Sequence, residues 1–191
     1  MRFIRLLVAT LLGVAACTGS VEKTSTPNEF VDAACADLSA WSTAVGSAFE
    51  DVQNLRQFGT SGDPVAEEGL LRTLVDSLRA AEVATAQLAK GISARGAPNI
   101  TDGEAIKNSI LDTLDRLREL LHTTRRDVDA FKLSTATKEQ TDALRLKIDE
   151  LTTNVGETFA RLAPLNQNNE LRAAFLGSAS CQGLSSSFGS S

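Results

Sequence analysis

The stretch TPNEFVDAACADLSAW, residues 26–41, carries the signals that decide the fold. Thr26 precedes Pro27, and Glu29 is placed to return the capping hydrogen bond, so a helix is expected to begin here. Apolar residues then recur at steps of three or four, which is the spacing of one helix face. This predicted buried face comprises Phe30, Ala34, Leu38, Trp41, Val45, Ala48, Val52 and Leu55.

Three more stripes with the same period follow along the chain. Asp63 and Pro64 are expected to start the second helix, which ends at the breaker run ARGAPN. TDGE at 101–104 and TKEQ at 137–140 resemble capping boxes for the third and fourth helices. The three predicted faces are Leu70, Leu74, Leu78, Ala81, Thr85, Leu88 and Ile92; Ile106, Ile110, Leu114, Leu117, Leu121, Thr124, Val128 and Phe131; and Leu144, Ile148, Leu151, Val155 and Phe159, with Leu162 beyond.

The composition agrees with an all-α fold. The 191 residues are 42% hydrophobic but only 5% aromatic, with four prolines, so the core must be built from aliphatic side chains that suit helices. Short turns between helices of similar length force antiparallel neighbours. We therefore predict an up-down-up-down four-helix bundle, with ELRAAFL from residue 170 as a short fifth helix at the C-terminus.

The N-terminal segment has the three-part layout of an export signal. Arg2 and Arg5 precede an apolar run, and small residues follow it. VAAC at 14–17 resembles the lipobox of bacterial lipoprotein signals, which implies cleavage before Cys17 and acylation of that cysteine. The alternative is an ordinary signal peptidase site. The predicted organisation is a signal peptide at 1–16, an acylated Cys17 and tether at 17–26, a bundle domain at 27–184 and a flexible serine-rich tail at 185–191.

The cysteine count fits this interpretation. Three cysteines in an exported protein leave one unpaired, and acylation of Cys17 would remove the surplus. Cys35 and Cys181 could then form a disulfide, which in the chain-entropy model stabilises the fold by about 4 to 5 kcal/mol. Zinc is the rival use of two thiols, but a single histidine, His122, and the lack of a CxxC motif leave too few ligands. The sequence therefore predicts a disulfide and no metal site.

The charge excludes one class of function. The net charge is −5, and removal of residues 1–16 takes away two arginines and no acid, which leaves 17 minus 24, or −7. We therefore expect no binding to nucleic acid by bulk electrostatics. Membrane attachment should come from lipid instead of basic residues.

The combination resembles small lipid-anchored helical proteins of actinobacteria. The resemblance rests on VAAC, on CADLSAW at 35–41 and on LRAAFLGSASC at 171–181. These segments cover the two ends of the chain, and none of them is specific to an activity. The resemblance implies a location and a fold, and no reaction.

No motif for catalysis or for a cofactor is found in the sequence. His122, the only imidazole, has no identifiable nucleophile or acid partner, so a helix-surface or groove position is expected. Trp41 is expected to pack in the core rather than to stack on a sugar. Small residues on the stripes, such as Ala81 and Thr85, favour close helix approach over a lipid-sized cavity.

These observations predict a non-enzymatic lipoprotein on the outer face of the bacterial membrane or envelope, where it presents a helical surface to a protein partner. The anchor at the start of the first helix would direct the turns near 58–63 and 134–136 away from the bilayer. Thr60, Ser61 and Thr135 are therefore the predicted partner-facing residues. The alternative function is binding of a lipid or another small apolar ligand within the bundle.

Overall fold

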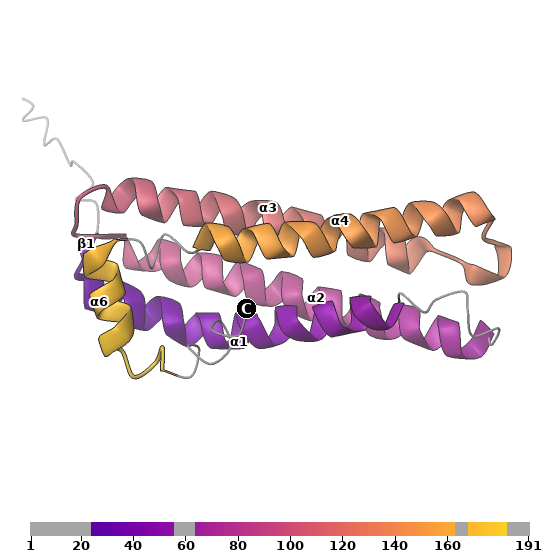
Figure 1. Ribbon diagram of the computed structural model, residues 1–191, viewed down its shortest axis with the longest axis horizontal. Helices are drawn as coiled ribbons and strands as arrows, with labels where there is room; N and C mark the ends of the chain where they lie inside the picture. Colours follow the sequence, from indigo (N-terminus) through magenta and orange to yellow (C-terminus); the bar gives the residue numbers. More distant parts are fainter. Residues whose placement is uncertain (1–23, 56–63, 163–167, 183–191) are drawn as a thin grey trace, which may run out of the picture.

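The computed structural model describes residues 24–55, 64–162 and 168–182 (Figure 1). Four long helices dominate it: α1 (Pro27–Asn54), α2 (Pro64–Arg95), α3 (Gly103–Ala130) and α4 (Lys138–Leu162). A short helix, α6 (Asn169–Gly177), lies across the start of α1, and a 3-10 turn, η2 (Leu133–Thr135), joins α3 to α4. The predicted all-α class and the short fifth helix are confirmed.

The long helices run antiparallel, and their packing is unequal. Helix α2 packs extensively on both α1 and α3, whereas α4 packs mainly on α3 and touches α1 little. We call the end that holds the start of α1 together with α6 the disulfide pole, and the end that holds η2 the opposite pole (Figure 1).

The predicted stripes form the core. All eight residues of the first stripe are buried, and so are the side chains of the fourth stripe from Leu144 to Val155. Leu70, Ile106 and Phe131, at the ends of the second and third stripes, are only partly buried and pack against the edge of the core. Leu71 and Val75 are buried at the start of α2 instead. The side chains of Phe159 and Leu162 lie outside the described residues.

Two of the predicted capping boxes are present. Thr26 accepts a hydrogen bond from the Glu29 amide, and the Glu29 carboxylate accepts one from the Thr26 amide at 2.9 Å. At α4, Thr137 accepts from the Gln140 amide, and the Gln140 side chain accepts from the Thr137 amide at 2.9 Å. These reciprocal bonds satisfy backbone donors that the first turn of a helix leaves unpaired.

The predicted capping box at 101–104 is wrong. Helix α3 begins at Gly103, and the residue before it, Asp102, is in the left-handed region with φ 60° and makes no side-chain cap. The chain turns tightly here, since the Ile100 amide donates to the Pro98 carbonyl at 2.9 Å. A Cβ on Gly103 would lie 2.0 Å from the same carbonyl oxygen, so only glycine fits.

A two-stranded parallel sheet causes this tight turn. Strand β1 (Thr24–Ser25) pairs with β2 (Ala97–Pro98), with Thr24 opposite Ala97. The Asn99 amide then donates to the Ser25 carbonyl at 2.8 Å. Residues 24–26, which the sequence assigns to the tether, are therefore part of the fold, and they fix the start of α1 beside the α2–α3 connection.

Candidate interaction surface

Several residues that the sequence singled out have no described position. Cys17, Thr60 and Ser61 lie outside the described residues, as do the signal segment and the serine-rich tail. Thr135 is described: it ends η2 at the opposite pole and is exposed. Of the predicted partner-facing residues, the structure therefore positions Thr135.

The predicted disulfide is present at the disulfide pole. Cys35 and Cys181 are bonded, with their Cα atoms 5.1 Å apart, and both are buried. Asn168 caps α6 by accepting from the amides of Glu170 and Leu171 at 2.9 and 3.1 Å. The Ser178 hydroxyl donates to the Asp32 carboxylate. The disulfide and the hydrogen bond from Ser178 thus hold the C-terminal segment against α1, and the Asn168 cap fixes the start of α6.

Trp41 belongs to the core, as predicted. Its side chain is fully buried, and its indole Nε1 donates to the Thr85 hydroxyl on α2 at 3.0 Å. Thr85 in turn donates to the Ala81 carbonyl at 2.7 Å. The indole is therefore an internal helix–helix contact and is not accessible to a ligand.

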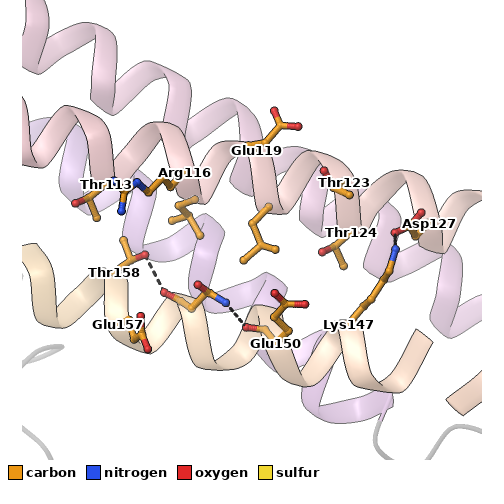
Figure 2. Close-up of a pocket in the computed structure, with 13 residues that line it drawn as sticks. Thr113, Arg116, Glu119, Thr123, Thr124, Asp127, Lys147, Glu150, Glu157 and Thr158 are labelled. Carbon is orange, nitrogen blue, oxygen red and sulfur yellow. Dashed lines mark hydrogen bonds and ion pairs between the residues drawn. The ribbon is translucent and has the colours of Figure 1, made fainter. Parts of the chain in front are cut away.

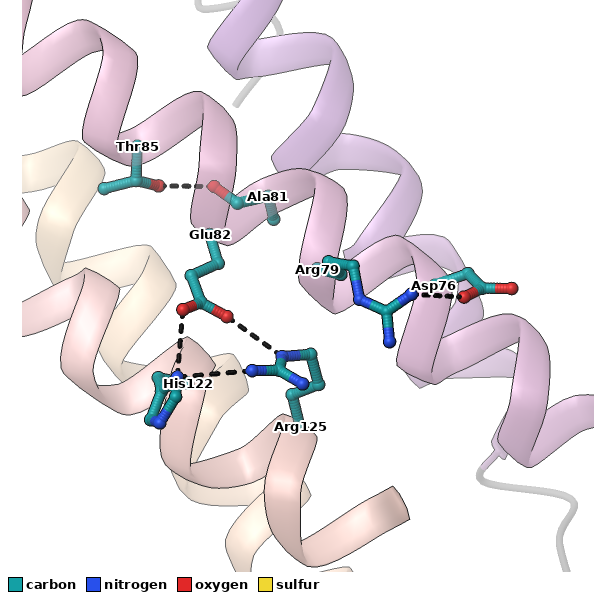
Figure 3. Close-up of polar contacts among 7 residues, drawn as sticks. All are labelled: Asp76, Arg79, Ala81, Glu82, Thr85, His122 and Arg125. Carbon is teal, nitrogen blue, oxygen red and sulfur yellow. Dashed lines mark hydrogen bonds and ion pairs between the residues drawn. The ribbon is translucent and has the colours of Figure 1, made fainter.

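His122 has an acid partner, contrary to the expectation from sequence. Its Nδ1 lies 2.9 Å from a carboxylate oxygen of Glu82 on α2, and Arg125 Nε donates to the other oxygen at 2.9 Å (Figure 3). Burial raises the pKa of Glu82, but the hydrogen bonds from His122 and Arg125 outweigh it, so the pKa lies below its usual value. The pairing depends on the register between two helices, which no local sequence pattern reports.

This cluster forms a helix–helix tie, by which we mean polar contacts that hold α2 against α3. Among the described residues, the side chains within hydrogen-bond distance of His122 Nδ1 are Glu82 at 2.9 Å and Arg125 at 3.3 Å, and neither is a hydroxyl or a thiol. A histidine without a nucleophile to activate gives no basis for assigning covalent catalysis. The cluster instead links α2 to α3 through one carboxylate and two basic side chains.

A groove lies along the seam between α3 and α4 (Figure 2). It has a volume of about 490 Å³, is open to solvent, and has a mainly apolar surface. Its lining on α3 is Thr113, Arg116, Leu117, Glu119, Leu120, Thr123, Thr124 and Asp127, and on α4 it is Lys147, Glu150, Asn154, Glu157 and Thr158. Four of the lining residues are threonines, and the two helices leave space between them along this seam.

A second hollow continues the groove toward the opposite pole. It has a volume of about 480 Å³ and is lined by the end of α3, by η2 and by the start of α4. The ion pair between Lys147 and Asp127 borders both hollows. Thr135, a predicted partner-facing residue, lines the second one. The described surface thus presents a nearly continuous depression from mid-bundle to the opposite pole.

A hollow inside the bundle is small by comparison. Between α1, α3 and α4, the hollow lined by Val45, Val52, Leu121 and Leu151 measures about 10 Å³. Ligand pockets usually measure several hundred Å³. The described core in this region is closely packed, as the small stripe residues predicted.

The described residues contain neither a candidate metal cluster nor a candidate membrane span. No group of three or more His, Cys, Asp or Glu residues is arranged to hold a metal ion within residues 24–55, 64–162 and 168–182. In the same ranges, no helix combines the length and the apolar character that a membrane span needs.

Comparison of the chain with protein-family models, with curated proteins and with solved structures gives no match.

Proposed function

We propose that the protein is a non-enzymatic, lipid-anchored envelope protein that binds a partner protein through its helical surface. The observation that carries the proposal is the groove along the α3–α4 seam, which is exposed and mainly apolar and is followed toward the opposite pole by a second hollow. Exposed apolar concavities of this kind are typical of binding sites.

The place where the described structure begins supports an orientation in which the N-terminal side is anchored. Thr24 begins the described structure at the disulfide pole, and only residues 18–23 separate it from Cys17. The seven residue-to-residue steps from Cys17 to Thr24 span at most about 25 Å even when fully extended. A lipid on Cys17 would therefore keep the disulfide pole close to the bilayer. The opposite pole, one length of α1 or about 42 Å away, would face outward.

The alternative function, a lipid or other small apolar ligand inside the bundle, receives no support from the described core. The hollow between α1, α3 and α4 measures about 10 Å³, which is much smaller than such a ligand.

Photo-crosslinking in intact cells tests the proposal. A crosslinking amino acid at Thr123, on the groove rim, or at Thr135, at the opposite pole, should capture a discrete envelope protein. The same group at Glu50, which is exposed on α1, serves as the matched control and should capture less of it. If none of these positions, nor a scan of the other exposed helix faces, yields a product, the proposal fails.

A further inference from the structure

The α3–α4 groove has dimensions that suit a helix. On α3 its lining runs from Thr113 to Asp127, a rise of 14 residues or about 21 Å. This is close to four helical turns. Binding of an amphipathic helix in an apolar groove is a common mode of recognition, in which residues spaced by three or four positions serve as anchors.

Three residues of the groove lining turn a polar group toward their own helix. The Thr113 hydroxyl donates to the Ser109 carbonyl at 2.7 Å, and the Thr158 hydroxyl donates to the Asn154 carbonyl at 2.8 Å. The side-chain amide of Asn154 donates to the Glu150 carbonyl at 2.9 Å. With these groups satisfied, the threonine methyls and the partly buried Leu120 are left for an outside partner. The floor therefore favours contact with apolar side chains of a partner.

The charges along the groove are unbalanced. Lys147 and Asp127 neutralise each other in an ion pair. Of the remaining charged lining residues, Glu119, Glu150 and Glu157 are acidic and Arg116 is basic, and none of these four forms an ion pair within the described part of the chain. Three carboxylates against one guanidinium give the groove a net negative rim. Such a rim attracts a cationic partner and repels an anionic one.

From these observations we infer that the α3–α4 groove is the docking site for a cationic amphipathic helix of the partner protein. The inference rests on the proposed function and adds the chemistry of the partner. The apolar stripe of the partner helix, about four turns long, lies on the floor of the groove. Lysines or arginines that flank this stripe face Glu119, Glu150 and Glu157. Anionic lipid headgroups are disfavoured by the same carboxylates.

Binding of designed peptides to the purified, full mature protein tests the inference. If the protein carries lipid it is placed in nanodiscs of zwitterionic phosphatidylcholine, with empty nanodiscs as the blank, and otherwise it is studied in buffer. Three peptides share one apolar stripe: the first carries lysines on its flanks, the second carries glutamates there, and the third is the lysine peptide interrupted by proline. Affinities are measured by calorimetry at low and high salt.

The lysine peptide should bind at least about tenfold more tightly than the glutamate or the proline peptide, and its advantage should shrink at high salt. The triple variant Glu119→Gln, Glu150→Gln, Glu157→Gln should weaken its binding by about tenfold or more. Thr123→Trp, which fills the groove, should abolish it. A charge-matched control, Glu50→Gln, Asp112→Asn, Asp149→Asn, should leave the affinity within about twofold, and circular dichroism verifies that each variant folds.

Equal binding of the lysine and glutamate peptides, equal effects of the two triple variants, or full binding by a folded Thr123→Trp protein would each overturn the inference. Binding of anionic vesicles in preference to the lysine peptide would overturn it in favour of a lipid surface. Because the measurement works with or without an acyl chain, its failure is distinguishable from failure of the proposed anchoring.

Discussion

Trp41 is a single side chain that ties two helices together inside the core. Its indole nitrogen has no water to bond with, because both Trp41 and Thr85 are fully buried. The Thr85 hydroxyl supplies an acceptor at 3.0 Å. A buried donor without a partner costs more than a formed hydrogen bond contributes, so the energetic importance of this pair exceeds that of an ordinary polar contact.

Thr85→Val keeps the shape of the side chain but removes the acceptor for Trp41. We expect the free energy of unfolding to fall by about 1 to 3 kcal/mol, measured by urea denaturation with the fluorescence of this single tryptophan as the signal. Thr73→Val is the matched control, since its hydroxyl donates to the Gly69 carbonyl on the exposed side of the same helix. A Thr85→Val protein as stable as the control would contradict the account.

Glu82 should make the stability of the protein depend on pH. Its folded pKa lies below the ordinary value of 4.5, so its contribution is present above pH 4.5 and is lost as the pH falls through the folded pKa. Glu82→Gln should therefore lower the free energy of unfolding at pH 7, by about 1 kcal/mol or less because the site is partly solvated. Denaturation at pH 7 and pH 3 should show that this difference shrinks in acid.

The control for Glu82 is Glu68→Gln on the same helix. Glu68 pairs with Arg72 across an exposed surface, so its loss should change the stability little at either pH. If Glu82→Gln and Glu68→Gln gave the same result at pH 7, the cluster would not be a helix–helix tie.

At the scale of elements, the start of α3 depends on one glycine. Gly103→Ala would place a Cβ 2.0 Å from the Pro98 carbonyl oxygen, which is backbone and cannot move freely. We expect a loss of about 1 to 3 kcal/mol in the free energy of unfolding. Gly156→Ala on α4 meets no atom within 4 Å and should instead stabilise the protein by about 0.5 to 1 kcal/mol. Thermal or urea unfolding that gave both variants the same sign would contradict this.

The elements also show why prediction from sequence succeeded for some features and failed for others. The buried helix faces and the capping boxes at Thr26 and Thr137 depend on spacings of three and four residues, which can be identified in the sequence. The pairing of Thr24 with Ala97 joins residues 73 positions apart through two-residue strands, which have no periodic signal. That pairing overrode the local capping pattern at Thr101.

The candidate surface depends on non-local geometry in the same way. Glu82 meets His122 because α2 and α3 pack in one register, and the groove depends on how α4 is placed on α3. Neither property can be deduced from one segment alone. The Cys35–Cys181 bond was predictable because the chain has three cysteines, and the assignment of Cys17 to acylation leaves these two as a pair.

At the scale of the whole molecule, the disulfide is the main restraint on the C-terminal segment. It joins residues 146 positions apart, and helix α6 packs mainly on α1. Cys35→Ala with Cys181→Ala should lower the free energy of unfolding by about 4 to 5 kcal/mol in urea. Amides of α6 should exchange hydrogen faster, whereas those of α2 and α3 should keep their protection. Unchanged stability together with unchanged exchange in α6 would contradict this role.

The central claim is that a lipid on Cys17 holds this bundle on the envelope, so that the seam between α3 and α4 is available to a partner. Intact-mass and fragment spectra of the protein purified from the envelope test the claim most directly. We predict a mature chain that begins at Cys17, carries acyl groups on that residue, and contains Cys35 and Cys181 in oxidised form. A chain with an unmodified Cys17, or one that retains the signal segment in a soluble fraction, would contradict it.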